Sequence, residues 1–148
     1  LREMIYQSAL RSKAAYSDTA DAVGNMGLNA GNAFSSNQEL IAFTEQVNKQ
    51  FKIGGASAQE QSNAMVQLTQ AMAAGVLRGQ DLNSILAAAP GIARTIEESM
   101  GWASGSIKQY AEDGKVTAQV VKNALLDMAD QTNQKFESIP MTLSDAMT

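Results

Sequence analysis

The chain has 148 residues, enough for one domain with a hydrophobic core, and 45% of them are hydrophobic although only 5% are aromatic. Its formal net charge of −4 argues against a nucleic-acid partner, because phosphate binding needs a basic face and the densest basic group is only Arg2, Arg11 and Lys13. The chain has no cysteine, which excludes disulfides and thiol catalysis, and no histidine, which removes the commonest general base and metal ligand.

The predicted elements are helices throughout, because no segment shows the alternation of a half-buried β-strand. The first helix is predicted from Arg2 to Ala15. Ser17 or Asp18 can cap a second helix, since their side-chain oxygens can accept from the first backbone amides. Two glycines weaken this second helix, each by roughly 1 kcal/mol relative to alanine. Residues 29–35 are predicted to form a loop.

The next two helix starts carry capping boxes, in which a hydroxyl accepts from the third backbone amide and a carboxylate reaches back. Ser36 with Glu39 opens one helix, and Ser57 with Glu60 opens the other. Gly75 is a suitable residue for ending the second of them. The first of these helices is expected to place four side chains on one face: Leu40, Thr44, Val47 and Phe51.

Shorter helices are predicted after residue 79. Leu82 lies in the first of them, and Pro90 suits the first turn of the next, because its missing amide hydrogen would have no partner there. Gly101 is expected to end that helix. Ser106 with Gln109 forms a third capping box and opens a short helix.

The longest helix is predicted at the end of the chain, capped by Thr117 and closed by Pro140. Its inner side is expected to carry six apolar residues: Val120, Val121, Ala124, Leu125, Met128 and Phe136. The whole pattern predicts an all-α fold, a compact multi-helix domain of about eight helices with mixed crossing angles, because no heptad repeat persists. Residues 1–140 are predicted to form this domain, and residues 141–148 to begin a following helix.

Both ends of the sequence resemble cuts in a longer protein. The chain starts at Leu1 without a signal-peptide pattern, and Thr142 to Thr148 reads as the start of a helix. No membrane span is predicted, because no apolar run reaches the roughly 18 residues that a span needs. The richest stretch, Ile85 to Ala93, is interrupted by proline and glycine.

Carboxylates are the only plausible catalytic groups in this composition. Three pairs are candidates: Glu97 with Glu98, Glu112 with Asp113, and Asp18 with Asp21. Adjacent residues on a helix point about 100° apart, so the first two pairs do not converge on one substrate atom. The third pair lies in a first helical turn, where acids favour the helix dipole. We therefore predict no enzyme activity and no catalytic, cofactor-binding or metal-binding residues.

Three pairs of glycines are spaced four apart: Gly27 with Gly31, Gly75 with Gly79, and Gly101 with Gly105. This spacing supports dimerisation of membrane helices only within an apolar segment of about 20 residues, which the chain lacks. We interpret these glycines as helix stops.

A sharp turn is predicted at Leu77, Arg78 and Gly79. Gly79 is expected to adopt a left-handed backbone conformation, Leu77 to be buried in the corner, and Arg78 to donate to the carbonyls that end the preceding helix. A contact between Arg78 and a partner is the alternative. Trp102 follows a helix-ending glycine and is expected to anchor the turn on the core, with partner binding as its alternative.

The segment from Gln67 to Pro90 carries Gln-Leu-x-Gln-Ala, a Gly-x-Leu-Arg-Gly turn, a polar helix start and a Pro-opened helix. In this order, these motifs resemble the tape-measure domain of long-tailed bacteriophages and prophages. Residues 111–118 resemble the family's acidic-Gly-Lys-apolar-Thr turn, and residues 139–142 its Pro-Met-Thr entry; residues 87–89 are less polar than the family pattern. The resemblance spans at least Asn37 to Thr148. Eight residues are the family-motif and interaction candidates: Gln67, Gln70, Leu77, Arg78, Gly79, Asp81, Pro90 and Trp102.

The resemblance implies a structural role in virion assembly, as part of a protein that sets tail length and occupies the tail tube. It implies contacts with tail tube, tail tip or tail assembly chaperone proteins, self-association as a further contact, and no cofactor. The implied location is the virion tail, and the bacterial host cytoplasm during assembly. Two alternatives stay open: a murein-directed hydrolase module, which would clear peptidoglycan, and a generic helical adaptor with a methionine-lined groove, which would bind amphipathic peptides.

Overall fold

The computed structural model describes residues 1–139 and confirms the all-α prediction for them. Its helices, in chain order, are α1 (Arg2–Arg11), α2 (Tyr16–Ala30), the short 3-10 helix η1 (Gly31–Ala33), α3 (Asn37–Ile53), α4 (Ala58–Ala74), α5 (Gly79–Ala88), α6 (Gly91–Met100), α7 (Ile107–Glu112), α8 (Ala118–Asp127) and α9 (Ala129–Glu137). Among these residues, β pairing is limited to one isolated antiparallel bridge, between Val76 and Thr117. None of the described helices has the length and apolarity that a membrane crossing requires.

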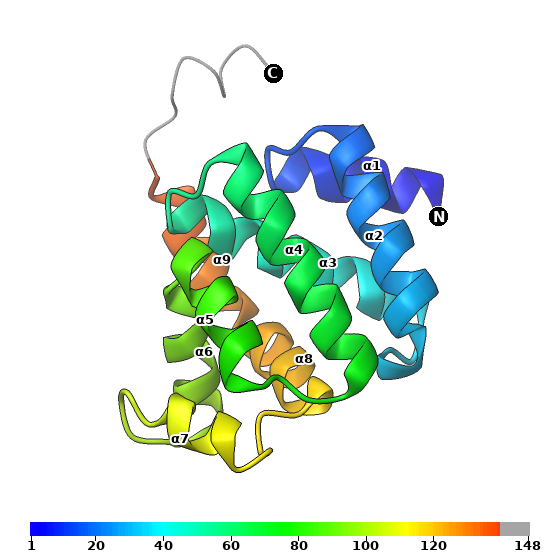
Figure 1. Cartoon of the computed structure of the whole chain (residues 1–148). Helices are drawn as coiled ribbons and strands as arrows, with labels where there is room; N and C mark the ends of the chain where they lie inside the picture. Colours follow the sequence, from blue (N-terminus) through cyan, green and yellow to red (C-terminus); the bar gives the residue numbers. More distant parts are fainter. Residues whose placement is uncertain (140–148) are drawn as a thin grey trace.

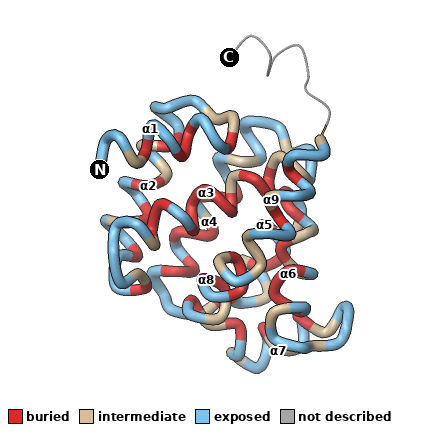
Figure 2. The backbone as a smooth tube through the Cα atoms, turned by 180° about the vertical axis from the view of Figure 1, so that it is seen from behind, coloured by how far each residue is buried: buried red, intermediate tan, exposed pale blue. Residues whose placement is uncertain are grey.

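Helix α3 is the centre of the fold. It packs against α1, α2, α6, α8 and α9, and Figure 2 shows the buried backbone concentrated along it and on the inner sides of its neighbours. Phe43, Val47 and Phe51 are completely buried. The predicted apolar face of this helix is therefore confirmed, but the helix is also buried on other sides, because neighbours cover it almost all round.

The remaining helices surround α3 at varied angles. Figure 1 shows α2 and α4 running side by side in front of it, with α5 and α6 to one side and α8 below. One continuous cluster of buried apolar side chains joins these helices. Its largest fully buried members are Phe43, Phe51, Met26, Leu68, Leu77, Leu82, Ile85, Ile92, Ile96, Leu125, Val47 and Val116.

Local capping chemistry fixes three of the helix starts as predicted. The hydroxyls of Ser36, Ser57 and Thr117 each accept from the backbone amide three residues later. At Ser57 the capping box is complete, because Glu60 accepts from its backbone amide at 2.9 Å. The carboxylate of Glu39 instead reaches one residue further back, to the amide of Ser35.

The predicted third capping box is wrong. Ser106 has helical backbone angles, and its hydroxyl donates to the carbonyl of Ala103 instead of capping α7. The carboxylate of Glu97, which is buried, accepts from the amide of Ile107 at 3.1 Å. A residue ten positions away on α6 thus satisfies the start of α7, which local sequence spacing does not reveal.

The first helix ends earlier than predicted and the second begins earlier. Helix α1 stops at Arg11, because Lys13 adopts a left-handed conformation (φ 56°) and the next amide donates back to the carbonyl of Ala9 at 2.9 Å. Ser17 and Asp18 are therefore inside α2 and do not cap it.

Helix α2 extends two residues into the segment predicted as a loop and ends at Ala30. It passes through Gly27, so the prediction of a helix stop at this glycine is wrong. A Cβ on Gly27 would lie 3.0 Å from the Cδ2 of Leu40, which shows that the glycine serves the close packing of α2 on α3. Residues 31–33 then form η1.

The predicted long C-terminal helix is broken into α8 and α9 at Met128, whose backbone angles are φ −98° and ψ 17°. The longest described helices are therefore α3 and α4, with 17 residues each. The break explains why nine α-helices are described where about eight were predicted. The predicted end at Pro140 and the helix start at residues 141–148 lie outside the described residues.

Candidate functional site

The two turns that carry the family resemblance lie against each other. The backbone amide of Leu77 donates to the carbonyl of Val116 at 2.8 Å, and the amide of Ala118 donates to the carbonyl of Gly75 at 2.9 Å. The side chains of Leu77 and Val116 are buried at this junction. These hydrogen bonds join the α4–α5 connection to the α7–α8 connection. The predicted burial of Leu77 is confirmed.

The left-handed residue of the corner is Gly75, and the prediction for Gly79 is wrong. Gly75 ends α4 with φ 90°, and Gly114 in the facing turn has φ 73°. Gly79 instead starts α5, and a Cβ there would meet no atom within 4 Å. Gly79 is therefore a helix start and not a helix stop.

Arg78 does not have the role predicted for it. The amide of Gly75 donates to the carbonyls of Ala71 and Met72, which end α4. Arg78 is exposed beside the facing turn, and its own backbone amide donates to the carboxylate of Asp81 at 3.4 Å. Asp81 thus helps to start α5, and the guanidinium of Arg78 stays at the surface.

The other motif candidates occupy separate places. Pro90 precedes α6, within one residue of its predicted position. Trp102 is half-buried and stacks on Tyr110 with ring centroids 3.9 Å apart and planes 8° apart, so it anchors the turn after α6 on α7. Gln67 is half-buried and Gln70 exposed on α4. The structure therefore joins the two turns but does not gather all eight candidates into one site.

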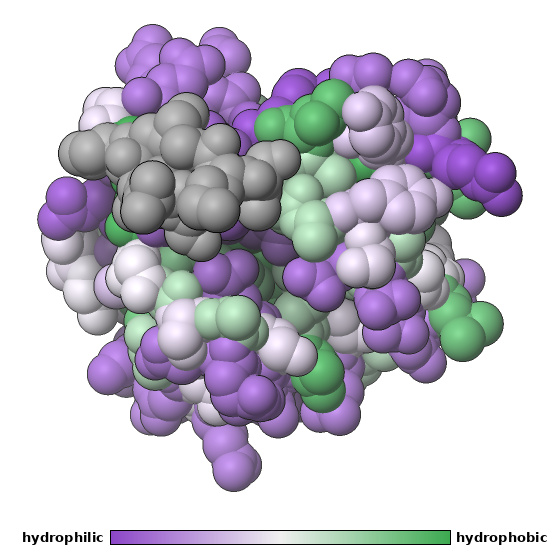
Figure 3. All heavy atoms as spheres, turned by 90° about the horizontal axis from the view of Figure 1, so that it is seen from above, coloured by the Kyte–Doolittle hydropathy of each residue, from purple (hydrophilic) through white to green (hydrophobic). Residues whose placement is uncertain are grey.

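A groove with a volume of about 830 Å³ runs between α2 and α4. Its lining includes Gln70, Met65 and Val66 from α4, and Asp18 and Asp21 from α2. Amide side chains from α2, α3 and α4 also line the groove. On the face seen in Figure 3, apolar residues form separate patches among hydrophilic ones.

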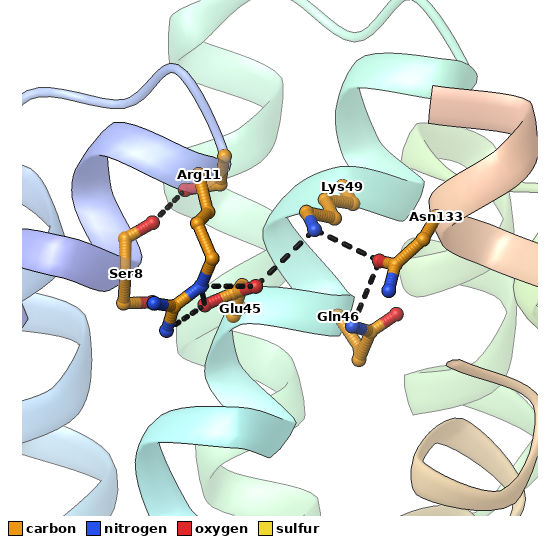
Figure 4. Close-up of polar contacts among 7 residues, drawn as sticks. Ser8, Arg11, Glu45, Gln46, Lys49 and Asn133 are labelled. Carbon is orange, nitrogen blue, oxygen red and sulfur yellow. Dashed lines mark hydrogen bonds and ion pairs between the residues drawn. The ribbon is translucent and has the colours of Figure 1, made fainter. Parts of the chain in front are cut away.

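Sequence reasoning missed a buried polar network on α3, shown in Figure 4. The carboxylate of Glu45 forms ion pairs with Arg11 from α1 at 2.8 Å and with Lys49 one turn later at 3.2 Å. Lys49 also donates to Asn133 of α9 at 2.8 Å, as does Gln46 at 3.2 Å. The spacing of Glu45 and Lys49 is typical of an exposed helix pair, so the sequence carried no signal that they are buried.

Opposing effects act on the pKa of Glu45. Burial raises it, but the hydrogen bond from Arg11 and the positive charge and hydrogen bond of Lys49 lower it by more. The pKa of the carboxyl therefore lies below its ordinary value, and Glu45 is ionised in the folded protein. Such a network can stabilise the arrangement of α1, α3 and α9, but it holds no reactive group facing a substrate cavity.

No group of three or more potential metal-ligating side chains occurs within residues 1–139. Among the acidic candidates, Glu97 is used to satisfy the start of α7, whereas Glu98, Glu112 and Asp113 are exposed. One of these acidic side chains therefore caps a helix, and the other three lie at the surface.

A matched pair of glycine substitutions tests the corrected corner. Gly75→Ala is expected to lower the free energy of unfolding by roughly 1–2 kcal/mol, because alanine in a left-handed conformation is strained. Gly79→Ala is expected to be neutral or to stabilise by up to about 1 kcal/mol, since it adds a helix-favouring residue in open space. Urea denaturation measures both, and a greater loss at Gly79 would contradict the assignment.

One of the comparisons with known proteins identifies a family for this chain. A family model for tape measure proteins matches the chain over residues 1–148. No curated protein and no solved structure matches it. Tape measure proteins are structural proteins of phage tails. The family model covers the paired junctions and every helix around them, and the chain therefore belongs to the tape measure protein family.

Proposed function

We propose that this chain is a folded assembly domain of a tape measure protein, which acts through contacts with tail tube, tail tip or tail assembly chaperone proteins. The observation that carries the proposal is the continuous buried cluster, which runs from Ile5 in α1 to Leu125 in α8. Such a core ties the segment into one compact unit. In this proposal residues 1–140 act as the domain, in the virion tail and in the host cytoplasm while the tail is assembled.

The dimensions of the segment support an anchoring role over a measuring role. As one continuous helix the chain would span about 220 Å, at roughly 1.5 Å per residue. A compact domain of this length has a radius of gyration of only about 15 Å. A folded domain of this kind would contribute little to a measured length, so we propose that it anchors or nucleates the tail.

The adaptor alternative rests on the groove between α2 and α4, where Met65 and Val66 lie among amide side chains. An adaptor of that kind would bind amphipathic peptides in solution without binding tail proteins. The hydrolase alternative would place its acids at Asp18 and Asp21 on the same groove wall. Clearing of peptidoglycan by the purified chain, and its loss in Asp21→Asn, would favour that alternative over the assembly role.

The test of the anchoring role is an in-frame deletion of residues 37–140 in the parent phage, with tail lengths measured by electron microscopy. Loss of assembled tails, or tails of nearly normal length, is expected of an anchoring domain. Viable tails shortened by roughly 1.5 Å for each deleted residue would contradict it, because a ruler segment gives that result.

A point substitution tests whether tail assembly depends on the folding of this domain while the length of the chain stays the same. Phe43→Ala removes a completely buried ring but leaves the number of residues unchanged. If the folded domain anchors the tail, this variant is expected to reduce the yield of tails. Gly24→Ala is the matched control, because a Cβ at Gly24 meets no atom within 4 Å. Normal yield from a Phe43→Ala protein that is shown to be unfolded would count against the proposal.

A further inference from the structure

Helix α9 is attached to the domain in a different way from the other helices. The continuous cluster of buried apolar residues ends in α8, and no residue of α9 belongs to it. Only Thr132 and Phe136 of α9 are buried. The ammonium groups of Lys13 and Lys49 each lie 5.4 Å from the centroid of the Phe136 ring.

The surface on which α9 rests is polar. Gln46 and Lys49 of α3 donate to the side-chain oxygen of Asn133, and Gln50 donates to the hydroxyl of Thr132 at 3.0 Å. These three residues form what we call the polar face of α3. Water can replace each of these polar contacts when the helices separate, and the ring of Phe136 is the one large apolar side chain of α9 that separation exposes.

Two features reduce the cost of separation further. The side-chain oxygen of Gln46 is buried without a hydrogen-bond partner among the described residues, and separation would let water reach it. Lys49 would keep its ion pair with Glu45, because both belong to α3. Undocking α9 therefore leaves no unpaired buried charge on the polar face.

The local sequence does not explain the break between α8 and α9. The sequence pattern predicts one uninterrupted helix from residue 118 onward, and neither glycine nor proline occurs between Ala118 and Glu137. The amides of Met128 and Thr132 still make helical hydrogen bonds across the break, to the carbonyls of Ala124 and Met128. The local sequence thus favours a straight helix, and the contacts with α3 favour a bent one.

We propose that α9 is a two-state strap, which exchanges between the docked position on α3 and a straight continuation of α8 that projects from the domain. The core formed by α1 to α8 stays folded in both states. Straightening moves the far end of α9 by on the order of 10 Å, since the helix is nine residues long. The strap would set whether the chain beyond α9 leaves along the domain or away from it.

The absence of cysteine makes the chain suitable for paired spin labels. Labels at Gln134→Cys and Asn63→Cys measure the distance between α9 and α4. Labels at Asn63→Cys and Asn83→Cys measure the distance between α4 and α5, within the core. All three positions are exposed. The test measures distance distributions from these pairs in the 148-residue chain.

The unsubstituted protein is expected to show two distances for the first label pair, one for each state, and a single distance for the core pair. Asn133→Ala combined with Phe136→Ala is expected to shift the first label pair to longer distances while the core pair and the helical circular dichroism signal stay unchanged. Gln131→Ala, exposed on the same helix, is the matched control and should change neither. A single distance for the first label pair in the unsubstituted protein, loss of helical signal in the double variant, or a change in the core pair would each overturn the proposal.

Discussion

Replacing Glu45 with alanine is expected to lower the free energy of unfolding by roughly 3–5 kcal/mol, because it leaves the buried ammonium of Lys49 without its carboxylate. The stability of a domain of this size is typically about 5–15 kcal/mol, so the loss is a large share of the total. Urea denaturation followed by circular dichroism measures it. Glu98→Ala on the exposed side of α6 is the matched control, with an expected change near zero.

The same network predicts how stability depends on pH. The folded pKa of Glu45 is lowered, so its contribution to stability is present above the unfolded value of about 4.5 and is lost as the pH falls through the folded pKa. Glu39 and Glu60 act in the same direction, because backbone amides of Ser35 and Ser57 lower their pKa values. Stability should therefore decrease below about pH 4.5.

Glu45→Gln isolates the contribution of the buried carboxylate to this acid loss. The variant is expected to be less stable at neutral pH and to lose less stability between neutral and acidic pH than the unsubstituted chain. Thermal melts across that range measure both. Equal slopes for the two proteins would show that Glu45 is protonated at its ordinary pKa, contrary to the network described here.

Phe43→Ala is the second substitution expected to have a large effect, with a loss of roughly 3–5 kcal/mol in the free energy of unfolding. Phe43 is completely buried in the middle of α3, and its ring centroid lies 5.3 Å from that of Phe34. The substitution removes the ring and leaves a cavity that surrounding helices can only partly fill. Denaturant titration gives the value.

Phe34→Ala provides the comparison, because this ring is only half-buried. It loses the same aromatic contact as Phe43→Ala but creates a smaller cavity, so its effect should be clearly smaller. Equal losses at the two positions would mean that the aromatic pair, and not the central burial of α3, accounts for the stability.

The sequence by itself determined those features that depend on nearby residues. The starts of α3, α4 and α8 follow from hydroxyls that accept a hydrogen bond three residues along the chain, at Ser36, Ser57 and Thr117. The burial of Leu77 follows from its place between two helices. The family also followed from the ordered turns, because the matching residues are close together in the chain.

Tertiary structure alone decided the features in which distant residues meet. The spacing of Glu45 and Lys49 is typical of an exposed ion pair on a helix. Both side chains are buried only because α1 and α9 cover that side of α3. Likewise, Glu97 replaces the predicted cap of α7 from another helix. Local patterns do not contain this information, since the partners come together only when the chain is folded.

Gly75 and Gly79, at the two ends of the Gly-x-Leu-Arg-Gly motif, show the difference between what the local sequence predicts and what the tertiary structure decides. The glycines at positions 75 and 79 predicted a sharp turn, but their spacing did not decide which of them has a left-handed backbone conformation. Pairing of the α4–α5 connection with Val116 and Ala118 decides in favour of Gly75, because those backbone hydrogen bonds fix the path of the chain from residue 75 to residue 77. Similarly, the local sequence around Met128 favours one helix, whereas in the folded chain the helix is broken at Met128 and α9 makes polar contacts with α3, 82 to 87 residues away in the chain.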